Sequence, residues 1–112
     1  ELRSPDPSTN PYLAFALVIG AGFFGMDNQL NLTESVNADL YHADKSVTEM
    51  LNRLPGSLDE ALNLVKESDF VKNILNEELV SKYIQMKSAE LEVYHMAADK
   101  NEYFFNNYFR VI

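Results

Sequence analysis

The sequence predicts a mostly α fold, one compact helical unit that covers all 112 residues. Helix-start signals precede its apolar stretches: Asn10 stands before Pro11, and Ser57 is followed three residues later by Glu60, the pattern of a capping box. Behind each signal, apolar residues recur at helical spacing or fill the segment completely. No segment alternates apolar and polar residues as a half-buried strand does, so we expect helices joined by loops.

The first expected helix covers residues 10–26. No charged residue occurs within 12–26, and this run is short of the roughly twenty residues that cross a bilayer. A helix that is apolar on every side is typical of a protein core or of an interface between domains, so we expect it to be buried. Its glycines, Gly20, Gly22 and Gly25, either permit close backbone packing or end the helix near the last of them.

The rest of the chain divides into a loop-rich region, 27–56, and a helical C-terminal part, 57–112. In the first we expect one short helix over 46–54, stopped by Pro55. The helices expected in the second are 58–67, a short one from 68 or 69 to 75, a long one from 76 to about 98, and a last one with an extended tail within 102–112. Charged residues of the long helix, Glu90 among them, are expected on its solvated side, and the aromatic tail is either core or an exposed patch for a partner.

Composition limits the possible partners. The net charge of −8, with the basic residues scattered, argues against nucleic acid and anionic membranes. The chain has no cysteine, so it has no disulfide and no thiolate metal site, which fits a reducing cytoplasm. It starts with glutamate rather than methionine and shows no targeting segment, so we expect a cytoplasmic protein and a part of a longer parent.

The opening segment, residues 1–9, contains the side chains best suited to chemistry. If this segment is extended, Glu1 and Arg3 project to the same face. A carboxylate suits a hard divalent cation such as Mg²⁺ or Mn²⁺, and a guanidinium binds carboxylate or phosphoryl oxygens in bidentate fashion. From the residues alone, a surface ion pair near a chain end is the better interpretation.

Three motifs occur along this chain. Glu-x-Arg-x-Pro-Asp-Pro followed by Asn-Pro-Tyr-Leu lies within 1–13, Leu-Pro-x-Ser-Leu-x-Glu-Ala-Leu spans 54–62, and Tyr-Ile-x-x-Lys-x-x-Glu spans 83–90. In their order and spacing these motifs resemble the glutamine synthetase family. The chain resembles the C-terminal part of a bacterial type I subunit. The resemblance implies the compact helical C-terminal portion of the glutamine synthetase catalytic domain.

The resemblance also implies roles for the opening residues. Glu1 would be a divalent-metal ligand, and Arg3 would be both catalytic and substrate-binding, in contact with glutamate and the phosphoryl group that leaves ATP. The full-length parent would join glutamate and ammonia through γ-glutamyl phosphate, with ATP and Mg²⁺ or Mn²⁺, in stacked hexameric rings. The piece alone would bind no cofactor and be inactive, since the family's other metal ligands and its nucleotide site lie upstream.

Three alternatives accompany this interpretation. Tyr41 stands where some relatives carry an adenylylated tyrosine, but His42 replaces the aspartate that follows in their motif, so we favour an ordinary loop tyrosine. Glu92 and His95 have the spacing of a di-iron helix motif, of which only one copy is present. The whole chain can also be a non-catalytic helical assembly module, or belong to a ligase that uses another amine or acid substrate.

Overall fold

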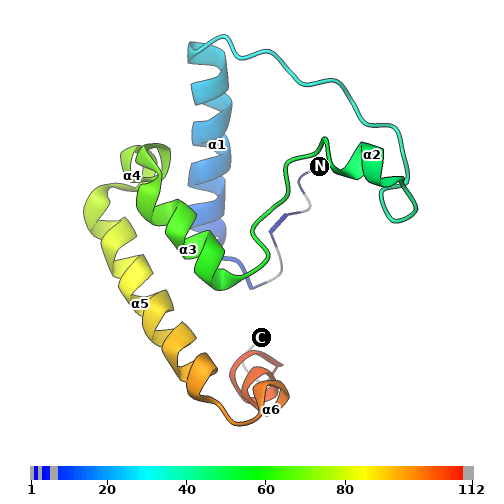
Figure 1. The fold of residues 1–112 in the computed structure, drawn as a ribbon. Coiled ribbons are helices and arrows are strands. Elements are labelled where there is room, and N and C mark those ends of the chain that lie inside the picture. Colours follow the sequence, from blue (N-terminus) through cyan, green and yellow to red (C-terminus); the bar gives the residue numbers. More distant parts are fainter. Residues whose placement is uncertain (1, 3, 6–7, 110–112) are drawn as a thin grey trace.

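The computed structural model describes residues 2, 4–5 and 8–109, and within these the chain forms helices and loops with no strand (Figure 1). The elements are α1 (Pro11–Asp27), α2 (Lys45–Thr48), α3 (Leu58–Glu67), α4 (Asp69–Leu75), α5 (Glu77–Met96), α6 (Lys100–Phe104) and the π-helix η1 (Phe105–Phe109). The predicted mostly α fold class is confirmed. None of the helices in the described ranges is long and apolar enough to cross a membrane.

Four helices form the packed part of the chain. α4 contacts both α1 and α5, and α3 lies along α5. Among the described residues the buried hydrophobic side chains are Leu62 of α3 and Val80 of α5, which are 4% and 3% exposed. The connection from α1 to α3, with α2 in it, stands away from these helices (Figure 1). The radius of gyration is therefore 17.0 Å, against roughly 13 Å for a closely packed domain of this length.

The start of α1 agrees with the sequence prediction, and its end does not lie at Gly25. The Oδ1 atom of Asn10 accepts hydrogen bonds from the backbone N–H groups of the second and third helical residues, at 3.0 and 3.3 Å. The helix continues to Asp27. Gly20 serves for close packing, because a Cβ atom there would lie 2.7 Å from Cδ1 of Ile74 on α4.

The capping box before α3 is present with one change. The Ser57 hydroxyl accepts from the N–H of Glu60 at 3.2 Å, as predicted. The carboxylate of Glu60 accepts from the N–H of Gly56 at 2.8 Å, one residue earlier than the standard form of the motif. α3 therefore has the predicted bounds.

Two predicted helix lengths were wrong. The short helix expected over 46–54 is a single turn, α2, and it has no side-chain hydrogen bond at its N-cap, Asp44. Such a short helix gains little from its own hydrogen bonds, so it stops after one turn. The long helix α5 ends at Met96, not near residue 98, because Ala97 takes an extended conformation, with φ −64° and ψ 127°.

The aromatic tail was expected to be either core or an exposed patch, and one part of it is packed while another part is exposed. Tyr103, Phe104 and Tyr108 form edge-to-face and tilted ring contacts with one another, and the first two also contact Tyr94 on α5. Phe109, by contrast, is 76% exposed. The helix starts at Lys100, two residues before the predicted range, because Asp99 caps it by accepting from two backbone N–H groups.

Candidate active-site segment

Glu1 and Arg3, the two predicted site residues, lie outside the described part of the chain. The described residues next to them form a bend at 4–5 and a turn at 8–9, and the chain then enters α1 at Asn10. The predicted active-site segment is therefore directly continuous with the N-terminus of α1.

The N-terminus of α1 is fully capped from within the chain. The side chain of Asn10 accepts hydrogen bonds from the N–H groups of Tyr12 and Leu13, and the backbone carbonyl oxygen of Asn10 accepts from the N–H of Ala14 at 3.0 Å. Pro11 has no N–H to donate. The first turn thus has no free amide for a ligand, and its role is to hold the chain that follows the opening segment.

Packing against α4 fixes α1 in turn. Gly20 lets the two helices approach at Ile74, and the rings of Phe24 and Phe70 meet edge to face with centroids 5.6 Å apart. This arrangement is near the preferred geometry of aromatic pairs. Since α4 also contacts α5, the segment before Asn10 is attached to the packed part of the chain through α1.

Tyr41 lies in an exposed turn on the connection between α1 and α3, and its side chain is 97% exposed. The turn is organised by Asp39, whose carboxylate accepts from the N–H of Tyr41 at 3.0 Å and lies 2.6 Å from Nδ1 of His42. The hydrogen bond with His42, and next the one with the Tyr41 amide, lower the pKa of Asp39 below its ordinary value. The turn presents the tyrosine to solvent.

His95 and Glu92 border a hollow of about 210 Å³ between α3 and α5. Nε2 of His95 lies 3.3 Å from the carboxylate of Asp59 on α3, so this histidine pairs across two helices. In the described ranges, no group of three or more histidine, aspartate or glutamate side chains is placed to hold a metal ion.

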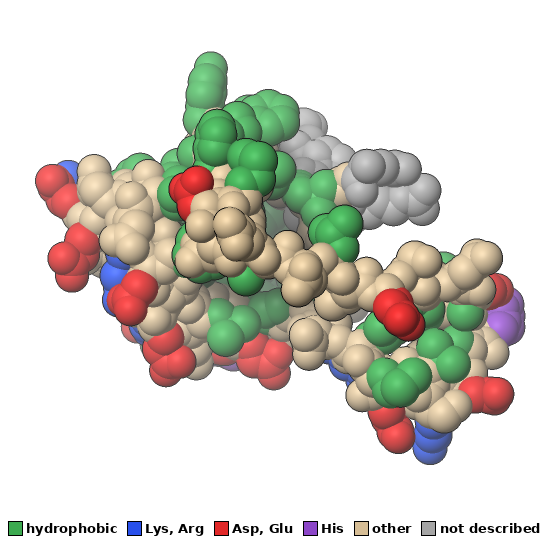
Figure 2. Space-filling model, turned by 90° about the horizontal axis from the view of Figure 1, so that it is seen from above, with side chains coloured by type: hydrophobic (Ala, Val, Ile, Leu, Met, Phe, Trp, Pro, Cys, Tyr) green, Lys and Arg blue, Asp and Glu red, His purple; other side chains and the backbone are tan. Residues whose placement is uncertain are grey.

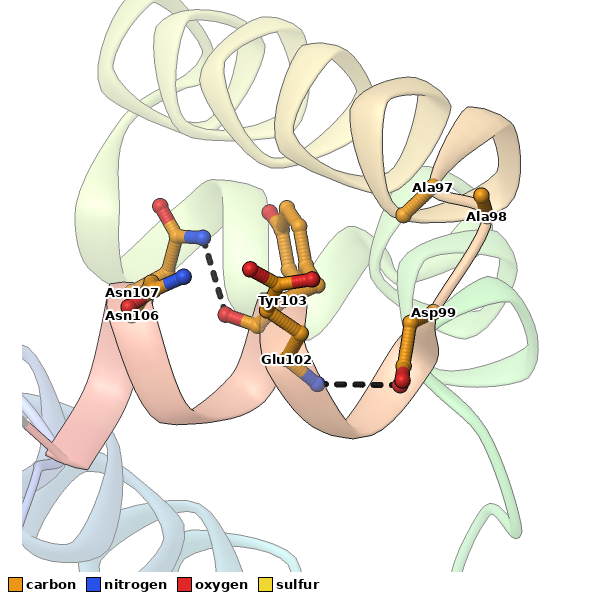
Figure 3. A pocket seen from close by; sticks show the side chains of 7 residues that line it. All are labelled: Ala97, Ala98, Asp99, Glu102, Tyr103, Asn106 and Asn107. Atoms are coloured by element: carbon orange, nitrogen blue, oxygen red, sulfur yellow. Dashed lines mark hydrogen bonds between the residues drawn. The ribbon is translucent and has the colours of Figure 1, made fainter.

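A second hollow, of about 270 Å³, lies where α5 gives way to α6 (Figure 3). Its lining residues are Ala97, Ala98, Asp99, Glu102, Tyr103, Asn106 and Asn107. Two of its polar side chains have structural partners: Asp99 caps α6, and the side-chain amide of Asn107 donates to the carbonyl of Tyr103 at 2.9 Å (Figure 3). No predicted site residue lies in it.

Glu90 is a residue whose role the sequence reasoning missed. It was expected on the solvated side of the long helix, but its side chain is only 25% exposed. Its carboxylate accepts from Lys87 Nζ at 2.7 Å and from the Tyr108 hydroxyl, and its carbonyl oxygen accepts from the Tyr103 hydroxyl at 3.3 Å. Glu90 therefore joins α5 to the aromatic tail. No local sequence signal indicates this contact, because Tyr108 lies eighteen positions further along the chain.

Comparison with known proteins identifies the family of this helical chain. The family described as "Glutamine synthetase, catalytic domain" matches residues 1–106. The chain belongs to this family.

Curated relatives are similar over most of this chain. It is 43% identical over 96 residues to a protein named "Glutamine synthetase" from Methanosarcina mazei, which is 84% of this chain and 22% of the relative. The identity is 38% to the "Glutamine synthetase" of Sulfolobus acidocaldarius, over 83% of this chain and 20% of that protein. The identity is 35% to the "Glutamine synthetase" of Staphylococcus epidermidis, over 84% of this chain and 22% of that protein. The chain thus spans about a fifth of the length of the relatives that it matches.

Proposed function

We propose that this chain is part of the catalytic domain of an ATP-dependent glutamate–ammonia ligase, which forms glutamine through γ-glutamyl phosphate. One observation carries the proposal: the family match runs over residues 1–106 and so includes the segment with Glu1 and Arg3. The relatives bear the name of this ligase. The chain alone is expected to be inactive, because it corresponds to about a fifth of such a protein.

The chemistry of Glu1 and Arg3 fits this reaction. A carboxylate is a suitable ligand for Mg²⁺ or Mn²⁺, which in the complete enzyme would neutralise charge on the phosphoryl oxygens of ATP. A guanidinium can bind the glutamate carboxylate or the transferred phosphoryl group in bidentate fashion. In our proposal Glu1 contributes one metal ligand, and Arg3 contacts substrate and the reacting phosphoryl group.

The described structure supports this assignment through the attachment of the opening segment. A catalytic side chain is effective only where its supporting structure is rigid. Asn10 ends the segment in a complete helix cap, and α1 is packed on α4. The N-terminus of α1, which directly follows residues 1–9, is therefore held in place by local hydrogen bonds and helix packing.

Three finer points belong to the same proposal. The motifs at 1–13, 54–62 and 83–90 favour a bacterial type I subunit, whereas the relatives include an archaeal protein at 43% identity and a bacterial one at 35%. We propose a cytoplasmic protein that assembles as stacked hexameric rings. Tyr41 is sufficiently exposed for enzymatic modification, but the residues that follow it favour an unmodified loop tyrosine.

A chimera tests the proposed function. In it, this chain replaces the corresponding segment of the Methanosarcina mazei relative, and glutamine formation is measured against the concentration of Mn²⁺. We expect ATP- and glutamate-dependent glutamine formation, and a marked rise in the Mn²⁺ concentration needed when Glu1→Gln removes the ligand charge. The matched control is Glu49→Gln, an exposed glutamate of the loop-rich region, which should leave the curve unchanged. A folded chimera that forms no glutamine would contradict the proposal.

A further inference from the structure

The hollow between α3 and α5 is formed by two helix faces that oppose each other. The helices run in opposite directions (Figure 1), and the contact of 3.3 Å between Asp59 and His95 lies at one end of the hollow. The hollow has a volume of about 210 Å³. Each helix contributes four lining residues at helical spacing: Asp59, Leu62, Asn63 and Lys66 from α3, and Ser88, Leu91, Glu92 and His95 from α5.

Two of the lining residues carry opposite charges and have no partner. Lys66 of α3 and Glu92 of α5 are exposed, and neither forms an ion pair or a side-chain hydrogen bond within the described part of the chain. The antiparallel register puts Lys66 beside Ser88, and Glu92 lies about 6 Å further along the axis of α5. The two charges therefore line the same hollow without pairing with each other.

Unpaired charges alone are no sign of a ligand in so acidic a chain. Figure 2 shows acidic side chains spread over one face of the molecule, some of them beside a lysine or arginine, as is usual for a solvated surface. The hollow differs because opposite charges share one space with two leucines, of which Leu62 is only 4% exposed. Asn63 and Ser88 add an amide and a hydroxyl whose side chains also lack a hydrogen-bond partner among the described residues.

A ligand for these walls needs an anionic group for Lys66, a cationic group for Glu92 and a small apolar part for the leucines. Since a water molecule takes up about 30 Å³ of the liquid, a hollow of about 210 Å³ holds roughly seven groups of that size. A free α-amino acid is of this size and carries both charges on one carbon atom. We propose that the hollow binds a free α-amino acid with a small apolar side chain. Lys66 holds its carboxylate and Glu92 holds its ammonium group, each through a charge-assisted hydrogen bond.

An NMR titration of the isotope-labelled 112-residue chain with L-valine tests this site. Two analogues serve as ligand controls: isovalerate is valine without its ammonium group, and isobutylamine is valine without its carboxylate. We expect saturable shifts of the backbone amide signals of the lining residues, with a Kd for L-valine on the order of 1 mM because the ligand is small. Both analogues should bind at least about tenfold more weakly, since each lacks one charge-assisted hydrogen bond.

Variants of the two charged residues locate the binding. Lys66→Met and Glu92→Gln each remove one charge at nearly constant side-chain length, and each should weaken L-valine binding about tenfold. The matched controls should keep the Kd of the original chain. They are Lys82→Met, which removes an ammonium group that pairs with Glu78 elsewhere on α5, and Glu49→Gln in the loop-rich region.

Binding at this hollow uses neither Glu1 nor Arg3 and is measured without turnover, so its test is independent of the proposed ligase function. Shifts that do not saturate, or equal shifts with L-valine and both analogues, would overturn the proposal. A Kd for L-valine that is the same in the original chain, Lys66→Met and Glu92→Gln would also overturn it, because the amino acid would then bind elsewhere.

Discussion

The two glycines Gly20 and Gly22 provide a direct test of how α1 packs on α4. Alanine is favoured over glycine in a helix by about 1 kcal/mol. At Gly22 a Cβ atom meets nothing within 4 Å, so Gly22→Ala should raise the free energy of unfolding by about 1 kcal/mol. At Gly20 the same atom would lie 2.7, 3.0 and 3.4 Å from three side-chain carbons of Ile74. Overpacking of this kind costs about 1–3 kcal/mol.

The two substitutions should therefore differ by about 1–3 kcal/mol, with Gly20→Ala neutral to destabilising. The strongly preferred χ1 rotamer of a β-branched side chain in a helix holds Cγ1 and Cγ2 of Ile74 in place, so rotation about χ2 can move only Cδ1 away. The assay is urea denaturation followed by far-UV circular dichroism.

The control is the same pair of substitutions in an Ile74→Ala background. That change removes all three carbons that crowd the new Cβ atom, so Gly20→Ala should then stabilise the chain by about 1 kcal/mol, as Gly22→Ala does. If Gly20→Ala stabilises the original chain as much as Gly22→Ala does, the close approach of α1 and α4 is refuted.

Three further predictions concern caps, the tail and the turn at 39–42. Asn76 caps α5 with φ 59° and ψ 156°, a backbone conformation that favours glycine. In urea denaturation, the Asn76→Gly variant should therefore be about 2 kcal/mol more stable than the Asn76→Ala variant. Equal stabilities of the two variants would contradict this. Tyr108→Phe removes the hydroxyl that donates to Glu90 and should lower the free energy of unfolding in urea by about 1 kcal/mol, whereas an unchanged free energy would count against the contact. The folded-state pKa of Asp39 is below its ordinary 3.8, so its contribution to stability is present above that pH and is lost as pH falls through the lowered value. In an NMR titration, His42→Ala should move this pKa upward, and no movement would exclude the histidine as the main cause.

Features encoded by neighbouring residues could be predicted from the sequence. Asn10 before a proline and Ser57 before Glu60 gave the starts of α1 and α3, because a cap is a hydrogen bond between residues two to four apart. The long helix began at Asn76 for the same reason. These signals need no knowledge of the tertiary structure.

Features that depend on distant contacts could not be predicted. The sequence gives no local sign that Glu90 bonds to Tyr108, eighteen positions along the chain. Likewise Lys100 turns back to the end of α5, where its Nζ atom donates to the carbonyl of His95 at 3.1 Å and lies 4.2 Å above the ring of Tyr94. This is a favourable place for a cation, at the negative end of a helix.

The apolar character of α1 was recognised from the sequence, but the spacing of its residues does not define which sides of the helix are covered, because that depends on tertiary contacts. The burial expected for residues 10–26 stays a prediction: in this chain Gly20 is the buried residue of α1, and Phe24, whose ring meets α4, is 48% exposed. Phe15, on another side of the helix, is 67% exposed. The proposed roles of Glu1 and Arg3 likewise depend on residues distant in the sequence, because a metal site needs ligands from several segments.

The measurement that tests the account most directly is glutamine formation by the chimera with and without Arg3→Ala. The matched control is Arg53→Ala, an exposed arginine of the loop-rich region. If this chain supplies an active-site arginine, Arg3→Ala should lower the rate on the order of 10² to 10³-fold while Arg53→Ala leaves it unchanged. Equal rates of glutamine formation by the unchanged chimera, its Arg3→Ala variant and its Arg53→Ala variant would contradict the placement of residues 1–9 in the active site.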